Sequence, residues 1–339
     1  MSLLIVLLGA VLSGVLTGLV RRYALAKHLL DHPNERSSHT RPTPRGGGLA
    51  IVVCFSATTL ALGLLGLAPW RACAALLVSG LLVATVGLLD DRYQVAARWR
   101  MLVHIVSGVC VLWSWAGIPL VPAFGREWDL GWIGVALTLL YLVWMVNLYN
   151  FMDGIDGIAS IQAITASLGG AACWWLATHS IHALVPVCFA ACVAGFLLWN
   201  YPPAKIFMGD TGSGFIGMTL GTLSIWAAHE TNRLFWCWMI LSGCFMVDAT
   251  TTFCRRAWRG ERVVEPHRSH AYQHASRVHG SHKKISLAIG AINLLWLFPL
   301  SMAVATDRLD GVVGVAIAYA PLVVLAYRYK AGARDEQLA

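Results

Sequence analysis

The sequence predicts an all-α, polytopic integral membrane protein, and three observations lead to this fold class. The 339 residues are 58% hydrophobic and only 12% charged, whereas soluble domains carry about 25% charged residues. Apolar runs long enough to cross about 30 Å of hydrocarbon as helices recur along the whole chain. Lys and Arg residues gather in alternate connections between these runs, a pattern typical of membrane topology.

Eleven apolar runs predict about eleven transmembrane helices in a single domain that covers residues 1–339. The first run is not expected to be a cleaved signal peptide, because its positive charges, Arg21, Arg22 and Lys27, follow it. The predicted spans are 2–20, 47–69, 72–89, 99–116, 131–149, 158–177, 182–199, 213–229, 234–253, 285–304 and 311–327.

The distribution of positive charge predicts the orientation. Of the 25 Lys and Arg residues, 21 fall on one side of the predicted membrane and 4 on the other. The positive-inside rule therefore places the N-terminus outside and the C-terminus in the cytoplasm. The same bias accounts for the net charge of +8, so no nucleic-acid partner is expected. The predicted cytoplasmic loops are 21–46, 90–98, 150–157, 200–212 and 254–284.

The first cytoplasmic loop combines basic residues with bare backbone. Arg41 and Arg45 flank two prolines, and three glycines, 46–48, follow directly. Glycine amides beside arginines suit a phosphate group. An ordinary basic loop that anchors the topology is the alternative interpretation.

Carboxylates and amides cluster where two further helices meet the cytoplasm. Asp90 and Asp91 end the third predicted helix, where adjacent side chains point in different directions. They can serve one site only if the helix frays or if they play different parts. Asn150, Asp153 and Asp156 are spaced by three residues and share one face, which suits sugar or base groups or a metal ion. Helix capping explains one acid, but not the whole set.

The loop 200–212 adds complementary chemistry. Asn200 precedes two prolines, which end a helix. Lys205 can supply a cation for phosphate, Phe207 a ring to stack on a base, and Asp210 an oxygen ligand for Mg²⁺. For Phe207, packing into the membrane interface is the alternative.

The last cytoplasmic loop, 254–284, is basic and rich in histidine. Its candidate site residues are His267, Arg268 and His270. A zinc site that adds His274 is conceivable, but no cysteine or acid spacing supports it. A basic strip for anionic lipid head groups is the simpler alternative. Asp248, the only acid within a predicted span, lies shortly before this loop.

In this order, the motifs resemble the polyprenyl-phosphate N-acetylhexosamine-1-phosphate transferases, a family that includes the MurNAc-pentapeptide translocase. The resemblance covers essentially the whole chain. It rests on residues 33–48, on Asp90-Asp91, on residues 147–157, on residues 203–213 and on the histidine loop.

The resemblance implies a multi-pass enzyme of the bacterial inner membrane, with a cleft on the cytoplasmic face. Such an enzyme uses Mg²⁺, for which Mn²⁺ can substitute. It transfers a sugar 1-phosphate from a UDP-N-acetyl sugar to undecaprenyl phosphate and releases UMP. Membrane lipids are the further expected partners, and a homodimer is compatible with the family.

The resemblance also assigns roles by motif. Asp210 is expected to bind the metal, and Asp90 and Asp91 are expected near the acceptor phosphate. One of this pair would act as a base or as a second metal ligand, and Asp91 is the candidate ligand. His270 completes the expected catalytic set. The substrate contacts expected from the motifs are Asn150, Asp153, Asp156, Asn200 and Phe207, of which Asp156 and Phe207 would contact uracil. The chemistry of the loops adds Arg41, Lys205, His267 and Arg268 as further expected contacts.

One motif departs from the family pattern. Many relatives show His-x-His-His in the last loop, whereas this chain has His270-Ala271-Tyr272-Gln273. The departure leaves open which histidine acts. It favours the branch that initiates O-antigen or other surface polysaccharides over the MurNAc-pentapeptide branch. The expected donor sugar is of the GlcNAc, FucNAc or QuiNAc type.

Three other functions share some of these features. A secondary transporter with a cytoplasmic anion site would place charges near the membrane midplane, but these acids lie at helix ends. An outer-face glycosyltransferase would carry its acids in outer loops, where Glu127 and Asp129 form the only close pair. A CDP-alcohol phosphotransferase needs further Gly and Asp residues that are missing after Gly157.

Overall fold

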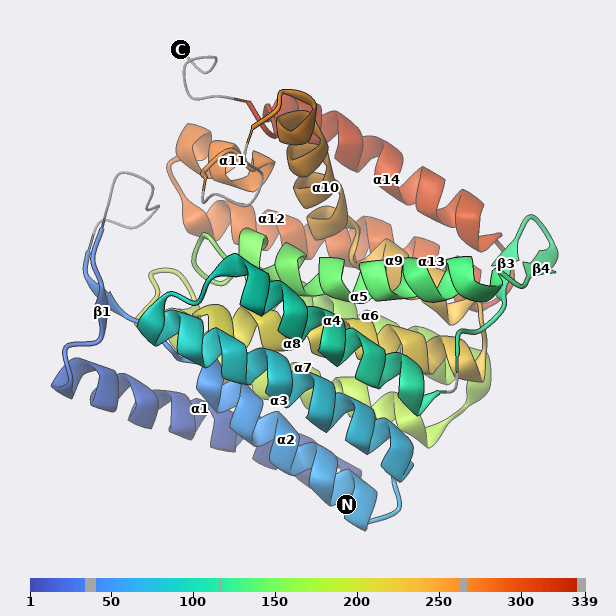
Figure 1. Ribbon diagram of the computed structural model, residues 1–339, viewed down its shortest axis with the longest axis horizontal. Helices are drawn as coiled ribbons and strands as arrows, with labels where there is room; N and C mark the ends of the chain where they lie inside the picture. Colours follow the sequence, from blue (N-terminus) through green and yellow to red (C-terminus); the bar gives the residue numbers. More distant parts are fainter. Residues whose placement is uncertain (34–40, 116, 262–266, 334–339) are drawn as a thin grey trace.

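The computed structural model describes residues 1–33, 41–115, 117–261 and 267–333, which form a bundle of helices (Figure 1). The first helices are α1 (Ser2–Ala26), α2 (Gly48–Leu64), α3 (Trp70–Tyr93), α4 (Ala97–Ser114), α5 (Gly131–Met152), α6 (Ile158–Thr178) and α7 (Leu184–Asn200). They are followed by α8 (Asp210–Glu230), α9 (Leu234–Leu241), α10 (Gly243–Trp258), α11 (Ala271–His279), α12 (His282–Ile292), α13 (Phe298–Ala305) and α14 (Gly311–Arg328).

The positions of the helices agree with the predicted apolar runs, whereas the number of possible membrane spans differs from the predicted number. Each of the eleven runs coincides with one helix or with consecutive helices. By length and hydropathy, six of the described helices could cross a membrane, or seven if the bent pair α9 and α10 counts as one span. The predicted number of eleven is therefore not confirmed, and neither is the orientation of the termini. The structure nevertheless has the long apolar helices of a multi-pass membrane protein.

Helix α8 explains part of this difference. Most of its side chains are buried, and many of them are small, because α8 packs against α2, α3 and α5 rather than facing lipid. A Cβ atom at Gly87 of α3 would lie 2.6 Å from the Asp210 carbonyl oxygen, and one at Gly48 of α2 would lie 2.4 Å from Gly212 Cα. Glycines thus allow the helix ends to approach closely around the start of α8.

The chain turns sharply between α9 and α10, which are bent by 69°. In Figure 1, α10 rises away from the bundle toward α11 and the C-terminal end. It packs against α5 and α14. This turn brings the segment after α10 back toward the end of α5.

Two short antiparallel strand pairs depart from the all-α prediction. Strand β1 (Leu30–Asp31) pairs with β2 (Thr43–Pro44), and β3 (Val121–Ala123) pairs with β4 (Arg126–Trp128). The pairs lie near opposite ends of the bundle (Figure 1). Proline prevents a helix in these connections, so backbone groups find their partners across a turn instead.

Candidate active site

A polar cavity of about 260 Å³ lies at one end of the bundle and is lined from all five predicted cytoplasmic loops. The first loop contributes Asp31 and Arg45, and the last contributes Gln273 and His282. The structure therefore brings these loops together around one cavity, although it leaves the side of the membrane untested. The predicted site residues that line the cavity are Asp91, Asn150, Asp153, Asp156, Asn200, Phe207 and Asp210.

Asp91, near the end of α3, accepts hydrogen bonds from the first residues of α8. Its Oδ1 accepts a hydrogen bond from the Asp210 backbone nitrogen at 3.1 Å. Its Oδ2 accepts from the Thr211 backbone nitrogen at 3.2 Å and from Thr211 Oγ1 at 2.9 Å. These are the unpaired N–H groups that any helix start must satisfy. Gly209 leaves room for the carboxylate, because a Cβ there would lie 2.8 Å from Asp91 Oδ2.

The Asp210 carboxylate faces the cavity. Asn150 Nδ2 donates to its Oδ1 at 2.9 Å, and Arg100 Nη1 lies 3.5 Å from its Oδ2. The enclosed site, then the Asp91 and Asp90 carboxylates, raise the pKa of Asp210 to about 7. Of its side-chain surface, 37% is exposed, so a cation can reach it.

Asp90 and Asp91 play different parts, because α3 stays helical through Tyr93. Asp91 lines the polar cavity. Asp90 instead lines a neighbouring cavity of about 70 Å³ between α3, α4, α5 and α8, and pairs with Arg100. The unfrayed helix thus separates the two carboxylates.

The loop between α5 and α6 carries the other two acids. Burial, and then the Asp210, Asp156 and Asp91 carboxylates, raise the pKa of Asp153 well above its ordinary value. Asp156 Oδ2 accepts from the Ala204 backbone nitrogen at 3.0 Å and lies 3.4 Å from His282 Nδ1.

Asn200 joins this loop to the segment that follows α7. Its Oδ1 accepts from the Gly157 backbone nitrogen and its Nδ2 donates to the Ile206 carbonyl oxygen, each at 3.0 Å. Both ends of the Asn200 amide are thus committed to the backbone, which makes it a structural member of the cavity wall.

An apolar groove of about 370 Å³ adjoins the polar cavity between α1, α2 and α3. Arg45 and Asp91 line both spaces. Arg45 donates to the Asp91 carbonyl oxygen and lies 3.6 Å from its Oδ1. The groove is lined mainly by the aliphatic and aromatic side chains Leu16, Leu19, Val20, Tyr23, Leu29, Leu49 and Leu88. A ligand with a charged head and an apolar tail would fit across this junction.

The carboxylate oxygens that line the cavity suit Mg²⁺, with Asp210 as the main protein ligand. Among the described residues, no group of three or more His, Cys, Asp or Glu side chains is arranged as a closed metal site. The Asp91 oxygens already accept hydrogen bonds from α8. Mg²⁺ commonly uses one or two carboxylates and takes its remaining ligands from water and substrate phosphates, and Asp210 fits that arrangement.

Comparison with known proteins identifies the family. Residues 73–228 match the family described as Glycosyl transferase family 4. A probable undecaprenyl-phosphate N-acetylglucosaminyl 1-phosphate transferase of Bacillus subtilis (strain 168) is 31% identical over 297 residues, which cover 83% of this chain and 79% of the relative. The chain belongs to glycosyl transferase family 4.

Two further relatives of this glycosyl transferase have different names. A decaprenyl-phosphate N-acetylglucosaminephosphotransferase of Mycolicibacterium smegmatis is 28% identical, over 95% of this chain and 87% of the relative. A phospho-N-acetylmuramoyl-pentapeptide-transferase of Moorella thermoacetica is 34% identical, but over only 56% of this chain and 62% of the relative. The stretch matched to the family runs from α3 to α8 and carries the cavity's carboxylates from Asp91 to Asp210.

Six predicted site residues of the glycosyl transferase lie outside the polar cavity, namely Asp90 in the neighbouring cavity and five others. Arg41 is exposed in the first loop, and Lys205 Nζ lies 5.8 Å from the Trp199 ring centroid. His270 is 2% exposed, and its Nδ1 lies 3.2 Å from Asp248 Oδ1. The other two are His267 and Arg268, and none of the five is a lining residue. Their substrate contacts stay predictions.

Three residues without a role predicted from the sequence also reach the site. Gln273 and His282 line the cavity, and Arg100 bridges Asp90 and Asp210. Arg45, which was predicted to lie beside a phosphate, lines the cavity as well. The sequence signal for Arg100 is a basic residue near the start of the helix that follows Asp90 and Asp91. The first-loop motif residues 34–40 lie outside the described residues.

Proposed function

We propose that this protein transfers an N-acetylhexosamine 1-phosphate from a UDP-sugar to undecaprenyl phosphate and releases UMP. The reaction would take place on the cytoplasmic face of the bacterial inner membrane and would initiate O-antigen or another surface polysaccharide. One observation carries the proposal: a polar, carboxylate-lined cavity meets an apolar groove at Arg45 and Asp91. The names of the relatives describe reactions of this type.

The donor would occupy the polar cavity. Phe207 would stack on the uracil ring, since any base offers a face to an aromatic side chain. Asp156 would accept hydrogen bonds from the base, and Asn150 and Asp153 would contact the diphosphate sugar. UDP-GlcNAc is the first donor to test, because two of the relatives carry N-acetylglucosamine in their names.

The acceptor would lie in the apolar groove. Its isoprenoid chain would contact α1, α2 and α3, while Arg45 binds the phosphate at the junction of the two spaces. The cavity beside Asp90 is a second route to Asp210, but at about 70 Å³ it is much smaller than the groove of about 370 Å³. The larger space is therefore the proposed one.

In the reaction, an acceptor phosphate oxygen attacks the sugar-bearing phosphorus, and the bond from that phosphorus to UMP breaks. Phosphoryl transfer of this kind depends on positioning and on neutralisation of charge. When bound at Asp210, Mg²⁺ would neutralise charge on the donor diphosphate. Asp91 holds Asp210 in place, and Arg45 orients the acceptor. A phosphate monoester is largely ionised at neutral pH, so no base is required.

The test is UMP release from purified protein in detergent, with undecaprenyl phosphate, Mg²⁺ and a panel of UDP-N-acetyl sugars. The expected result is UMP release that requires the lipid, stops with EDTA and favours one donor. Absence of UMP from every donor with folded protein would contradict the proposal. Uptake of a UDP-sugar into proteoliposomes without conversion would then favour a transporter.

A further inference from the structure

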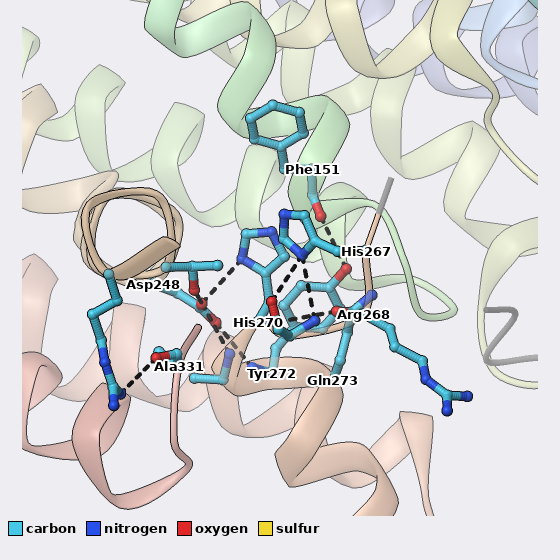
Figure 2. A network of polar contacts seen from close by, with 12 residues as sticks. Phe151, Asp248, His267, Arg268, His270, Tyr272, Gln273 and Ala331 are labelled. Atoms are coloured by element: carbon cyan, nitrogen blue, oxygen red, sulfur yellow. Dashed lines mark hydrogen bonds and ion pairs between the residues drawn. The ribbon is translucent and has the colours of Figure 1, made fainter. Parts of the chain in front are cut away.

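The segment that begins α11 is held from one side by a carboxylate of α10. Asp248 is 6% exposed. It accepts hydrogen bonds from the Ala271 and Tyr272 backbone nitrogens, both at 2.9 Å. Its Oδ1 also lies 3.2 Å from His270 Nδ1 (Figure 2). An acid placed at these free N–H groups stabilises the start of the helix and fixes its position relative to α10.

On its other side, Tyr272 contacts the end of α5, where the loop that carries Asp153 and Asp156 begins. Its hydroxyl donates to the Phe151 carbonyl oxygen at 3.0 Å (Figure 2). Phe151 lies in the last turn of α5, where carbonyl groups have no partner within the helix. Burial raises the pKa of Tyr272 well above its ordinary value, so the hydroxyl keeps the proton that it donates.

Gly154 provides the space for this hydroxyl. A Cβ atom there would lie 2.2 Å from the Tyr272 oxygen, far inside contact distance. Gly154 does not adopt a positive φ, so its backbone conformation does not require glycine. The requirement is one of space. The neighbouring Gln273, whose Nε2 would lie 3.1 Å from the same Cβ, lines the polar cavity.

Tyr272 therefore contacts the chain both before and after Asp153, one of the acids that line the cavity. Phe151 and Gly154 stand on either side of Asp153, and both touch Tyr272. The chain of contacts runs from Asp248 in α10 through the start of α11 to the loop between α5 and α6. Tyr272 thus lies against the loop whose Asp153 lines the cavity.

We propose that Tyr272 is a positioning residue, which holds the loop that carries Asp153 and Asp156 in its substrate-binding conformation and requires glycine at position 154. The consequence for catalysis rests on the proposed function, in which this loop contacts the UDP-sugar. Tyr272 itself touches no substrate. Its removal should therefore weaken donor binding without changing acceptor binding.

The test is a double-mutant cycle of Tyr272→Phe, Gly154→Ala and the combined variant, measured by UMP release and by thermal unfolding. Tyr272→Phe should raise the KM for the donor about fivefold, the equivalent of one hydrogen bond. Its kcat and the KM for the lipid should stay within about twofold. Gly154→Ala should raise the donor KM more than about tenfold, because the methyl group meets the hydroxyl.

The combined variant decides between an interaction and two independent effects. Phenylalanine removes the oxygen that the new Cβ would contact, so the donor KM and unfolding temperature should return close to those of Tyr272→Phe alone. The control is Tyr319→Phe, which removes another hydroxyl bonded to a backbone carbonyl, that of Met239 at 2.7 Å. It should lower the unfolding temperature without changing the donor KM.

Additive effects of the two substitutions, or an equal donor KM change in Tyr319→Phe, would overturn the proposal. Recovery of folding by Tyr272→Phe in a Gly154→Ala chain that does not fold alone would support it. Absence of UMP release from the unmodified protein would contradict the proposed function. The unfolding measurements would still support or overturn the contact itself.

Discussion

At the residue scale, the carboxylates of Asp90, Asp91 and Asp210 differ in their contacts and in their exposure. Asp91 uses both oxygens on the backbone and hydroxyl groups that start α8. Asp90 is paired with Arg100. Asp210 has the most exposed side chain of the three, at 37% against 10% for Asp91 and 11% for Asp90. It is therefore the carboxylate best placed to meet a cation or a substrate.

Asp210→Asn should reduce UMP release at least about a hundredfold, because an amide neutralises less charge on a bound metal ion. The unfolding temperature should change little, since Asn150 can still bond to the substituted side chain. The control is Asp307→Asn, whose side chain is 84% exposed away from the cavity. Unchanged turnover of Asp210→Asn at limiting Mg²⁺ would show that Asp210 is not the metal ligand.

Asp91→Ala should have a different effect, namely a loss of folding stability as well as activity. Removal of a helix cap costs about 1–2 kcal/mol, and three groups lose their acceptor here. Thermal unfolding in detergent measures this effect. A role as metal ligand alone predicts loss of activity with an unchanged unfolding temperature, and that result would exclude the capping role.

At the scale of elements, the site exists because helix ends converge. Helix α8 starts where α3 and α5 end, and glycines of α2 and α3 allow the close approach. Helix α1 covers one side of this junction and provides much of the apolar groove. The polar cavity thus lies at the ends of the helices, while the groove follows their sides.

Val20→Trp should fill part of this groove and raise the KM for undecaprenyl phosphate about tenfold, with the donor KM unchanged. Val20 lines the groove. Val15→Trp is the matched control, because Val15 is on the same helix, is 57% exposed and is not a lining residue. Steady-state kinetics with each substrate varied in turn checks this. Equal effects of the two variants would place the isoprenoid chain elsewhere.

At the scale of the whole molecule, the five predicted cytoplasmic loops meet at one end of the bundle. This arrangement agrees with the alternation inferred from Lys and Arg residues, although it does not identify the compartment. The β3–β4 pair lies toward the opposite end (Figure 1). A labelling experiment on intact cells can connect the two ends to the two sides of the membrane.

Asp307→Cys should react with a membrane-impermeant thiol reagent in intact cells, whereas Lys284→Cys should react only after the membrane is opened. Both positions are exposed. Both variants would be made in a Cys254→Ser chain, because Cys254 is the exposed cysteine among the residues that the structure describes. The reverse pattern of labelling would invert the predicted orientation.

The sequence by itself determined the helical runs, the loops that carry the chemistry and the family. These are properties of local hydropathy and of motif order, so they can be followed along one chain. Local hydropathy did not determine the number of membrane spans. Buried helices such as α8 carry small and polar residues that hydropathy alone does not distinguish from interfacial segments.

Only the tertiary structure decided which side chains meet. Asp91 caps a helix that starts 119 residues later in the chain, while Lys205 and His270 lie outside the cavity despite their motifs. Tyr272 contacts Phe151 because α10 turns away from α9 and returns the chain to the end of α5. The physical reason is that sequence spacing fixes a side chain's direction on its own helix. The angles and close approaches between helices fix what that side chain touches.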